Sequence, residues 1–153
     1  MPGLPLVGGC ACGALRYEVR AAPFTVYNCH CLNCQKISGA AFNTSIMIAE
    51  ASLAFTVGSP ARVEWRSDAG NMRFGWFCQG CGSRIVNGMA PSNGVLSLRA
   101  GTLDDTSWVE PVGDTWVKSR QSWVTIPEGR IQVERQPTDY AAFIAKFRTL
   151  GRF

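Results

Sequence analysis

Seven cysteines constrain what this 153-residue chain can fold into more than any other feature. They form a C-x-C pair, a C-x-C-x-x-C triplet and a C-x-x-C pair, which are Cys10 and Cys12, then Cys29, Cys31 and Cys34, then Cys78 and Cys81. Because seven is odd, they cannot all pair into disulfides. The first residues, MPGLPLVGGC, show no secretory signal. Cysteines this dense in an unexported chain indicate metal binding or catalysis rather than a disulfide framework.

The two outer cysteine pairs are typical of one shared metal site. A C-x-x-C followed by glycine makes a tight turn that points both sulfurs at one ion, and Gly82 can take the positive φ that closes it. Gly13 repeats the cysteine–glycine–strand pattern. We therefore predict a closed, structural zinc site that contributes about 10 kcal/mol of folding free energy, with the ligands Cys10, Cys12, Cys78 and Cys81.

The three remaining cysteines predict a second metal site of a different kind. Cys29, Cys31 and Cys34 are close enough in sequence to wrap one ion. Three protein ligands with an exchangeable fourth are typical of reactive zinc, whereas closed tetrahedra are structural. His30, the only histidine, lies between two of these cysteines, and we expect it to point away from the ion. Two alternatives stay open: a structural site completed by an Asp, Glu or water oxygen, or three free thiols.

Most of the chain reads as short strands separated by turn signals, which predicts a mainly β protein. The strand candidates are residues 14–19, 42–48, 53–57, 61–67, 72–77, 83–88, 95–101 and 115–126. Asp68-Ala69-Gly70-Asn71 predicts a hairpin connection. In residues 42–48 the pattern places one side of the strand in the core, namely Phe42, Thr44, Ile46 and Ile48.

Two segments are expected to be helical. Residues 31–38 predict a turn or two directly after the triplet, ended by Gly39. Residues from about 138 to about 150 carry an apolar stripe that we expect to pack against the sheet, with Thr138 or Asp139 as the cap and Gly151 at the end. The stripe consists of Tyr140, Phe143, Ile144, Phe147 and Leu150.

Composition narrows the classes of function. A hydrophobic content of 46% and a charged content of 17% are typical of a globular protein. No apolar run reaches the roughly 18 residues of a membrane span. The net charge of +4 comes without a run of Lys or Arg, which argues against nucleic-acid binding. We expect one domain over residues 1–153, with a core at about 8–135, in the cytoplasm; a homodimer is left open.

Four motifs follow one another from Gly8 to Trp123: GGCACGALRYEV, NCHCLNCQKISGAAF, RFGWFCQGCGSRI and GDTWVKSRQSW. In this order they resemble the family of glutathione-dependent formaldehyde-activating enzymes and centromere protein V. The resemblance implies a β-tent of folded antiparallel sheets. It also implies two zinc ions per chain, a structural one on Cys10, Cys12, Cys78 and Cys81 and a second, catalytic one on Cys29, Cys31 and Cys34.

The activity implied by the resemblance is that of a carbon–sulfur lyase, which forms or cleaves an adduct between a thiol such as glutathione and a small aldehyde such as formaldehyde. One departure concerns the tail motif. Many relatives carry a histidine in this motif just before the aromatic residue and the Lys/Arg-Ser pair, whereas this chain reads Asp114-Thr115-Trp116-Val117-Lys118-Ser119 there, with no histidine. If that imidazole binds substrate or moves protons in relatives, this chain uses Asp114 differently or lacks the step.

Three thiolates around one zinc leave a net charge of −1, which makes the ion a weak Lewis acid. Such an ion suits another task, lowering the pKa of a fourth thiol that then attacks an aldehyde carbon. Lys36, Ser38 or water could deliver the proton to the new hydroxyl, and Lys36 could also offset the negative charge of the cluster. Candidate cations for the carboxylates of a tripeptide thiol are Arg62, Arg66, Arg73, Lys118 and Arg120, and candidate pocket walls are Phe42, Trp76, Trp116 and Trp123.

Two other classes of function remain compatible with the sequence. One is a non-catalytic binding module in which both zinc ions are structural and the sheet recognises a macromolecule. The other is a labile zinc or thiol buffer based on the triplet. The two classes differ from the enzyme in what the triplet does: it is inert in a module, and it releases metal in a buffer.

Overall fold

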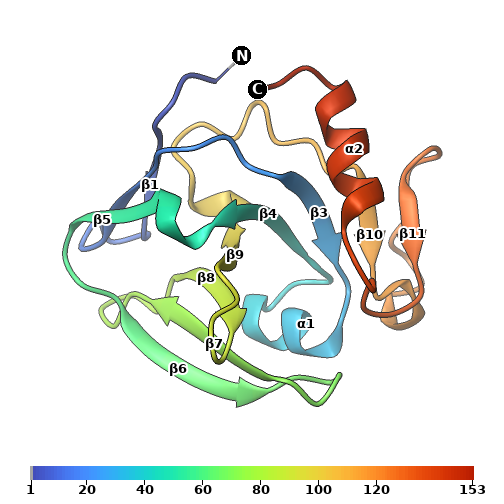
Figure 1. Cartoon of the computed structure of the whole chain (residues 1–153). Coiled ribbons are helices and arrows are strands. Elements are labelled where there is room, and N and C mark those ends of the chain that lie inside the picture. Colours follow the sequence, from blue (N-terminus) through green and yellow to red (C-terminus); the bar gives the residue numbers. More distant parts are fainter. Residues whose placement is uncertain (1) are drawn as a thin grey trace.

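The computed structural model describes residues 2–153, which form two β-sheets and two α-helices (Figure 1). The smaller sheet has the strand order β1-β2-β5, with β1 (Leu6–Gly9), β2 (Arg16–Val19) and β5 (Leu53–Val57). The larger sheet has the order β11-β10-β3-β4-β9-β8-β7-β6. Its strands are β3 (Thr25–Cys29), β4 (Asn43–Ala49), β6 (Ala61–Arg66), β7 (Met72–Phe77), β8 (Arg84–Met89), β9 (Val95–Arg99), β10 (Gly113–Thr115) and β11 (Ile131–Val133). The prediction of a mainly β protein is confirmed.

Antiparallel pairing dominates, because most consecutive strands are joined by short turns. The hairpin expected at Asp68–Asn71 joins β6 to β7. The exceptions are at one edge, where β10 pairs parallel to both β3 and β11. Three strands, β1, β3 and β11, were not anticipated from the sequence, and of β10 only Thr115 was, because these strands are short and lack a clear alternating pattern.

The strand predicted over residues 115–126 is wrong. Only Thr115 continues β10, and Trp116 then takes a left-handed backbone conformation with φ 57°. A 3-10 turn follows, η3 (Val117–Ser119). The alternating valines and tryptophans of this segment suggested a strand, but the partner strand β3 ends at Cys29, so there is no ladder for it to extend.

β4 is buried on both faces, which the sequence prediction missed. Ile46 and Ile48 lie in the core as expected, whereas Thr44 is only half-buried. The intervening Ser45 and Met47 are also buried. The reason is that β4 lies inside the larger sheet, between β3 and β9, with the core on one face and a cavity on the other.

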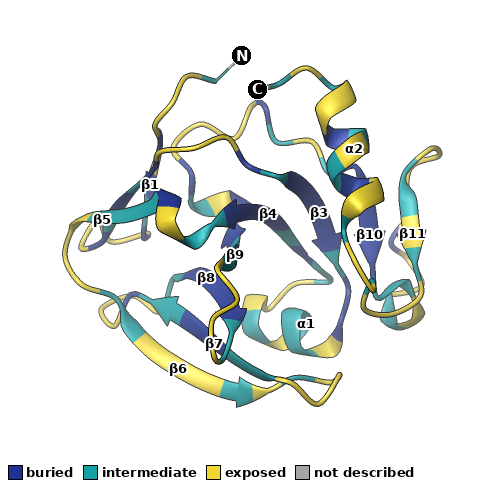
Figure 2. Cartoon of the chain, in the orientation of Figure 1, coloured by how far each residue is buried: buried dark blue, intermediate teal, exposed yellow. Residues whose placement is uncertain are grey.

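Both predicted helices are present. α1 (Leu32–Ser38) ends at Gly39, which has φ 65°. α2 (Ala141–Thr149) follows Asp139, whose carboxylate accepts a hydrogen bond from the Ala141 N–H at 2.8 Å. The side chains of Phe143 and Phe147 are buried against the larger sheet. Figure 1 shows α2 beside β3 and β10, and Figure 2 shows that those strands are among the most buried. Two further 3-10 turns are η1 (Glu50–Ser52) and η2 (Ala100–Thr102).

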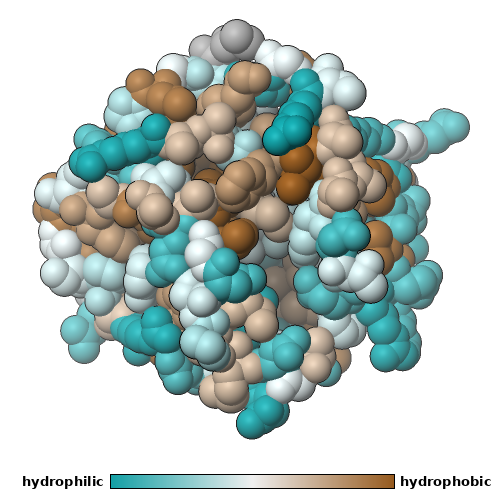
Figure 3. Space-filling model, viewed as in Figure 1, coloured by the Kyte–Doolittle hydropathy of each residue, from teal (hydrophilic) through white to brown (hydrophobic). Residues whose placement is uncertain are grey.

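The longest helix, α2, has 9 residues, and none of the helices in residues 2–153 combines the length and apolar character that a membrane span needs. On the face shown in Figure 3, hydrophobic side chains gather across the middle and hydrophilic ones lie around and between them.

Candidate metal centres and cavity

The four cysteines of the two outer pairs meet where the two sheets join. Cys10 and Cys12 follow β1 of the smaller sheet, and Cys78 and Cys81 lie between β7 and β8 of the larger sheet. Their four sulfur atoms lie within 4.8 Å of one another, with 3.6 Å between Cys10 and Cys12 and 3.7 Å between Cys12 and Cys78. Four sulfurs each about 2.3 Å from one zinc would be about 3.8 Å apart. The donor set therefore fits a closed tetrahedral site that would tie the sheets together.

Backbone N–H groups and a hydroxyl surround this four-cysteine cluster. The Leu15 N–H donates to the Cys10 sulfur at 3.2 Å. The Ser83 hydroxyl and its backbone N–H lower the pKa of Cys81 to about 5. Gly13 and Gly82 have φ of 79° and 77°, as the tight turns require. Donors around a sulfur stabilise its thiolate form, the form that binds a metal.

The cysteine triplet lies at the junction of β3 and α1. Cys29 ends β3, Cys31 is the N-cap of α1 and Cys34 is in its first turn. The Cys31 sulfur accepts the Cys34 N–H at 3.2 Å, which satisfies one of the free donors of the helix start. The three sulfurs lie within 4.8 Å of one another, and no imidazole or carboxylate from residues 2–153 joins them at that distance.

The three thiols of the triplet form a strongly coupled group. Hydrogen bonds from Cys31 and then Cys34 hold the pKa of Cys29 well below its usual value. Contacts with Cys29 and Cys31 raise the pKa of Cys34. Three thiolates gathered in a largely buried place would need a positive ion beside them, which fits a soft divalent metal.

His30 points away from the triplet, as expected. Its side chain is fully buried, and its Nε2–H donates to Oδ1 of Asp114 at 2.8 Å. The same oxygen accepts from the Asn28 amide at 3.1 Å, and Arg130 lies 3.7 Å from the other carboxylate oxygen. Asp114 therefore holds the imidazole that precedes Cys31.

The backbone of His30 is held as tightly as its side chain. Its N–H donates to the Thr115 carbonyl at 3.0 Å. Its carbonyl accepts from the Gln35 amide at 2.8 Å and from the Ser119 hydroxyl at 2.9 Å. The tail motif thus fixes the peptide between Cys29 and Cys31, which places both sulfurs.

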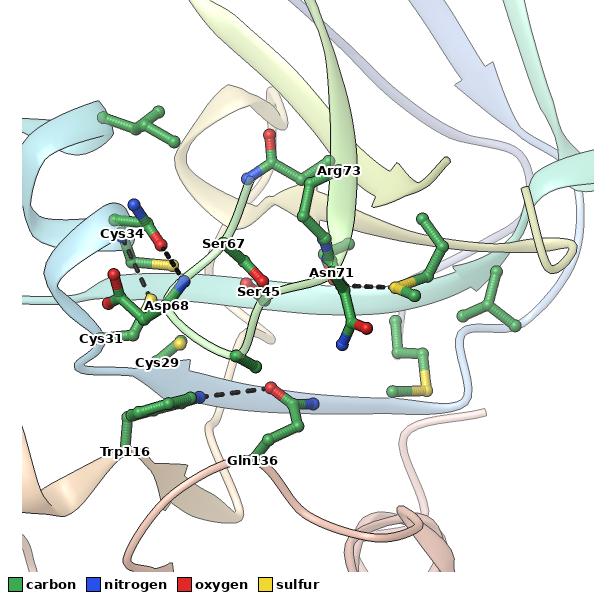
Figure 4. A pocket seen from close by; sticks show the side chains of 18 of the residues that line it. Cys29, Cys31, Cys34, Ser45, Ser67, Asp68, Asn71, Arg73, Trp116 and Gln136 are labelled. Atoms are coloured by element: carbon green, nitrogen blue, oxygen red, sulfur yellow. Dashed lines mark hydrogen bonds between the residues drawn. The ribbon is translucent and has the colours of Figure 1, made fainter. Parts of the chain in front are cut away.

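A cavity of about 390 Å³ opens directly beside the triplet. All three of its cysteines line the cavity, whereas none of the four-cysteine cluster does. Figure 4 shows the triplet at one end and side chains from the β6–β7 hairpin and the larger sheet around the space. The lining combines a mostly apolar surface with several neutral polar side chains, and its only charged side chains are Asp68 and Arg73. Such a space is within the range of small-molecule sites.

Few of the other residues suggested by the sequence reach this cavity. Of the five candidate cations only Arg73 lines it, and of the four candidate aromatic walls only Trp116 does. Trp76 packs against Phe55, and Trp123 is 74% exposed. The candidate proton donors Lys36 and Ser38 lie outside the lining, and the Ser38 hydroxyl donates to the Cys34 carbonyl at 2.7 Å.

Several lining residues were missed by sequence reasoning. Asp68 lies at the tip of the β6–β7 hairpin. Its backbone N–H donates at 2.8 Å to the side chain of Asn33, the residue before Cys34. Trp65 and Tyr27 also line the cavity, together with Tyr140, which the sequence pattern had placed in the apolar stripe of the C-terminal helix. The turn sequence at Asp68 predicted the hairpin, but no local signal indicated that its tip lies over α1.

Trp116 is held against the cavity in a strained conformation. A bulky residue with φ 57° and ψ 38° is rare, because its Cβ crowds the backbone. The indole N–H donates to the Gln136 side chain at 3.2 Å (Figure 4). The backbone N–H donates to the Arg135 carbonyl at 3.2 Å. Strain of this kind gathers at functional sites.

The fold is mainly β, and each of its two thiol clusters could hold a soft metal ion, with the three-cysteine cluster beside a cavity and the four-cysteine cluster away from it. Residues 5–119 match the family described as glutathione-dependent formaldehyde-activating enzyme, and the chain belongs to that family. A crystal structure of a Rhodobacter sphaeroides protein has a similar fold, with a TM-score of 0.53 and 16% identity, covering 84% of this chain and 99% of the other. A search of curated proteins gives no significant match.

Proposed function

We propose that this protein forms or cleaves adducts between a thiol such as glutathione and a small aldehyde, and that the reaction takes place at the cysteine triplet. The observation that carries the proposal is the contrast between the two clusters. Both gather thiols at metal-binding distance, but only the triplet, with one ligand fewer, opens into a cavity. An open position beside a cavity is typical of a reactive metal site.

Two zinc ions fit the two donor sets. Cys10, Cys12, Cys78 and Cys81 would hold a structural ion, and Cys29, Cys31 and Cys34 would hold the second. When bound at the triplet, zinc would lower the pKa of an incoming thiol and so favour its thiolate form.

The reaction itself is a simple addition. The thiol loses its proton, its sulfur forms a bond to the aldehyde carbon, and the carbonyl oxygen gains a proton to become a hydroxyl. The reverse reaction returns thiol and aldehyde. The cavity walls would hold the two reactants together, which contributes the proximity that a bimolecular addition lacks in solution.

Asp68 is the residue best placed to carry the proton. It is the only carboxylate in the cavity lining, and its hairpin is attached to α1 through Asn33, next to Cys34. It takes the role that the sequence suggested for Lys36 or Ser38. Positioned acid–base groups typically contribute about 10²- to 10⁴-fold to a rate.

The alternative functions predict different behaviour of the triplet. In a binding module with two structural zinc ions, both clusters would resist a chelator equally. In a zinc or thiol buffer, the triplet would lose its ion readily without accelerating any addition. The cavity beside the triplet favours the enzyme over the module, because a purely structural cluster has no need of one.

The test is exchange between glutathione and formaldehyde, measured by NMR with and without zinc-loaded protein. We expect acceleration by the wild type and its loss in Cys31→Ser. Serine is a good N-cap, so the substitution keeps the start of α1 while removing a sulfur ligand. The control is the zinc content of the variant, which should retain the ion of the four-cysteine cluster. Absence of acceleration by the wild type with any thiol would refute the proposed function.

A second variant pair tests the proton carrier. Asp68→Asn should slow the exchange by about 10²-fold or more. Glu64→Gln is the matched control, because Glu64 is an exposed carboxylate of the same hairpin that pairs with Arg62 and does not line the cavity. Equal rates in the two variants would remove Asp68 from the mechanism.

A further inference from the structure

Three arginines gather on the cavity face of the larger sheet. Arg73, on β7, lines the cavity directly. On β9, Leu96 and Leu98 point into the core while Val95 and Ser97 line the cavity, so Arg99 continues the cavity face. Arg84, on β8, donates to the side chain of Asn87, a cavity residue, at 2.7 Å.

The sheet makes room for the Arg84 guanidinium with a glycine. A Cβ at Gly75 would lie 2.3 Å from Nη1 of Arg84, so the guanidinium crosses the sheet over this glycine. Gly75 is two residues beyond Arg73 on the same face of β7. The guanidinium also lies 5.2 Å from the ring centre of Trp65, another cavity residue. Arg84 and Arg73 are therefore neighbours on this face.

None of these cations has a counter-ion in the described part of the chain. No carboxylate of residues 2–153 lies within 4.0 Å of Arg73, Arg84 or Arg99. The only side-chain acceptor of Arg73 is the sulfur of Met89 at 3.1 Å, a weak one. Arg99 is only 6% exposed, yet both of its terminal nitrogens lack a hydrogen-bond partner.

Burial and the nearby Arg99 charge lower the pKa of Arg84. The two guanidinium groups therefore repel each other in a place with little water. Unpaired charges buried in this way are costly, and an anionic ligand beside them would offset the cost. At the other end of the cavity, the triplet and Asp68 would repel an anion, so the favourable place for a negative group is beside Arg73.

We propose that the arginine floor, formed by Arg73, Arg84 and Arg99, binds a carboxylate of the thiol substrate while the thiol lies at the cysteine triplet. The inference rests on the proposed function for its thiol, and it adds the residues that would select a thiol by its carboxylate. Arg73 contacts the carboxylate directly. Arg84 and Arg99 lie behind the wall made by Asn87, Ser45 and Ser97 and raise the positive potential there.

The first test compares 3-mercaptopropionate with its amide as thiols for formaldehyde exchange, each rate divided by its uncatalysed rate. The wild type should prefer the carboxylate by about 10- to 100-fold, the range for charge-assisted hydrogen bonds. Arg73→Gln should remove the preference by slowing only the carboxylate, and Arg73→Lys should keep part of it. Arg20→Gln, which removes the same charge from an exposed site on the other sheet, should leave the preference unchanged.

The second test needs no reaction. Propionate is titrated into the zinc-loaded protein while the side-chain Nε–H signals of the arginines are followed by NMR. Saturable shifts of Arg73 and Arg84 signals that vanish in Arg73→Gln support the anion site even if no thiol reacts. Acceleration of both thiols without preference, or propionate shifts that are absent or survive in Arg73→Gln, would overturn the inference and leave the proposed function intact. Absence of acceleration with both of these thiols and with glutathione would refute only the proposed function.

Discussion

Replacing Asp114 by alanine should destabilise the protein far more than an ordinary loss of one aspartate. Asp114 is 1% exposed and accepts hydrogen bonds from His30 at 2.8 Å and Asn28 at 3.1 Å. Each hydrogen bond to a charged group is worth about 1.5–3 kcal/mol, and the two donors would stay buried without a partner. Breaking a buried ionic group in this way costs about 3–5 kcal/mol.

The assay is urea unfolding of zinc-loaded protein, with thermal unfolding as a second measure. For a chain of this length each kcal/mol shifts the Tm by about 2–4 °C, so Asp114→Ala should lower it by about 6–20 °C. Asp104→Ala is the matched control, since Asp104 forms an exposed pair with Arg16 that is worth at most about 1 kcal/mol. If the unfolding free energies of Asp114→Ala and Asp104→Ala differ by less than about 1 kcal/mol, the buried network does not hold the triplet loop.

Three other predictions follow from single features. Gly82→Ala should lower the unfolding free energy by about 1–2 kcal/mol, because φ is 77° there, and should speed zinc loss from the four-cysteine cluster; Gly101→Ala, which meets no atom within 4 Å, is the control. Arg99→Met should raise the unfolding free energy measured in urea by about 1–3 kcal/mol, because it removes an unpaired buried charge. A lower unfolding free energy in this variant would contradict the absence of a partner for Arg99. Burial raises the pKa of Tyr17 to about 12, so its contribution to stability should hold below about pH 10 and be lost as the pH rises toward 12. Phenolate absorbance should stay low at pH 10, since burial also raises the pKa of the other two tyrosines, Tyr27 and Tyr140. Half-ionised tyrosines at pH 10 would contradict their burial.

The division of the cysteines into two clusters could be predicted from the sequence, because the triplet and each of the two outer pairs span only a few residues. The spacing within Cys78-Gln-Gly-Cys81 and its following glycine determine a turn, and the repeat at Cys12-Gly13 indicates the partner half. The strands of the β6–β7 hairpin were equally readable, since the turn residues and the alternation lie side by side in the chain.

The cavity could not be predicted, because its walls come from segments far apart in the chain. Arg73 and Arg99 look like ordinary strand arginines until the strand order β9-β8-β7 places them on one concave face. Trp116 looked like part of a strand, but the hydrogen bonds of the tail motif to the backbone of His30 force the chain into a turn. Long-range pairing overrides local propensity at both places.

Counting the sulfur ligands of zinc by X-ray absorption tests the central claim most directly. In protein with two zinc ions and no added thiol, a closed cluster of four cysteines and an open one of three should average about 3.5 sulfurs per zinc. Adding a carboxylate-bearing thiol should raise the average to about 4, and Cys31→Ser should abolish this rise. An average that does not change with thiol, or one oxygen ligand that persists at the second zinc in its presence, would contradict the open site.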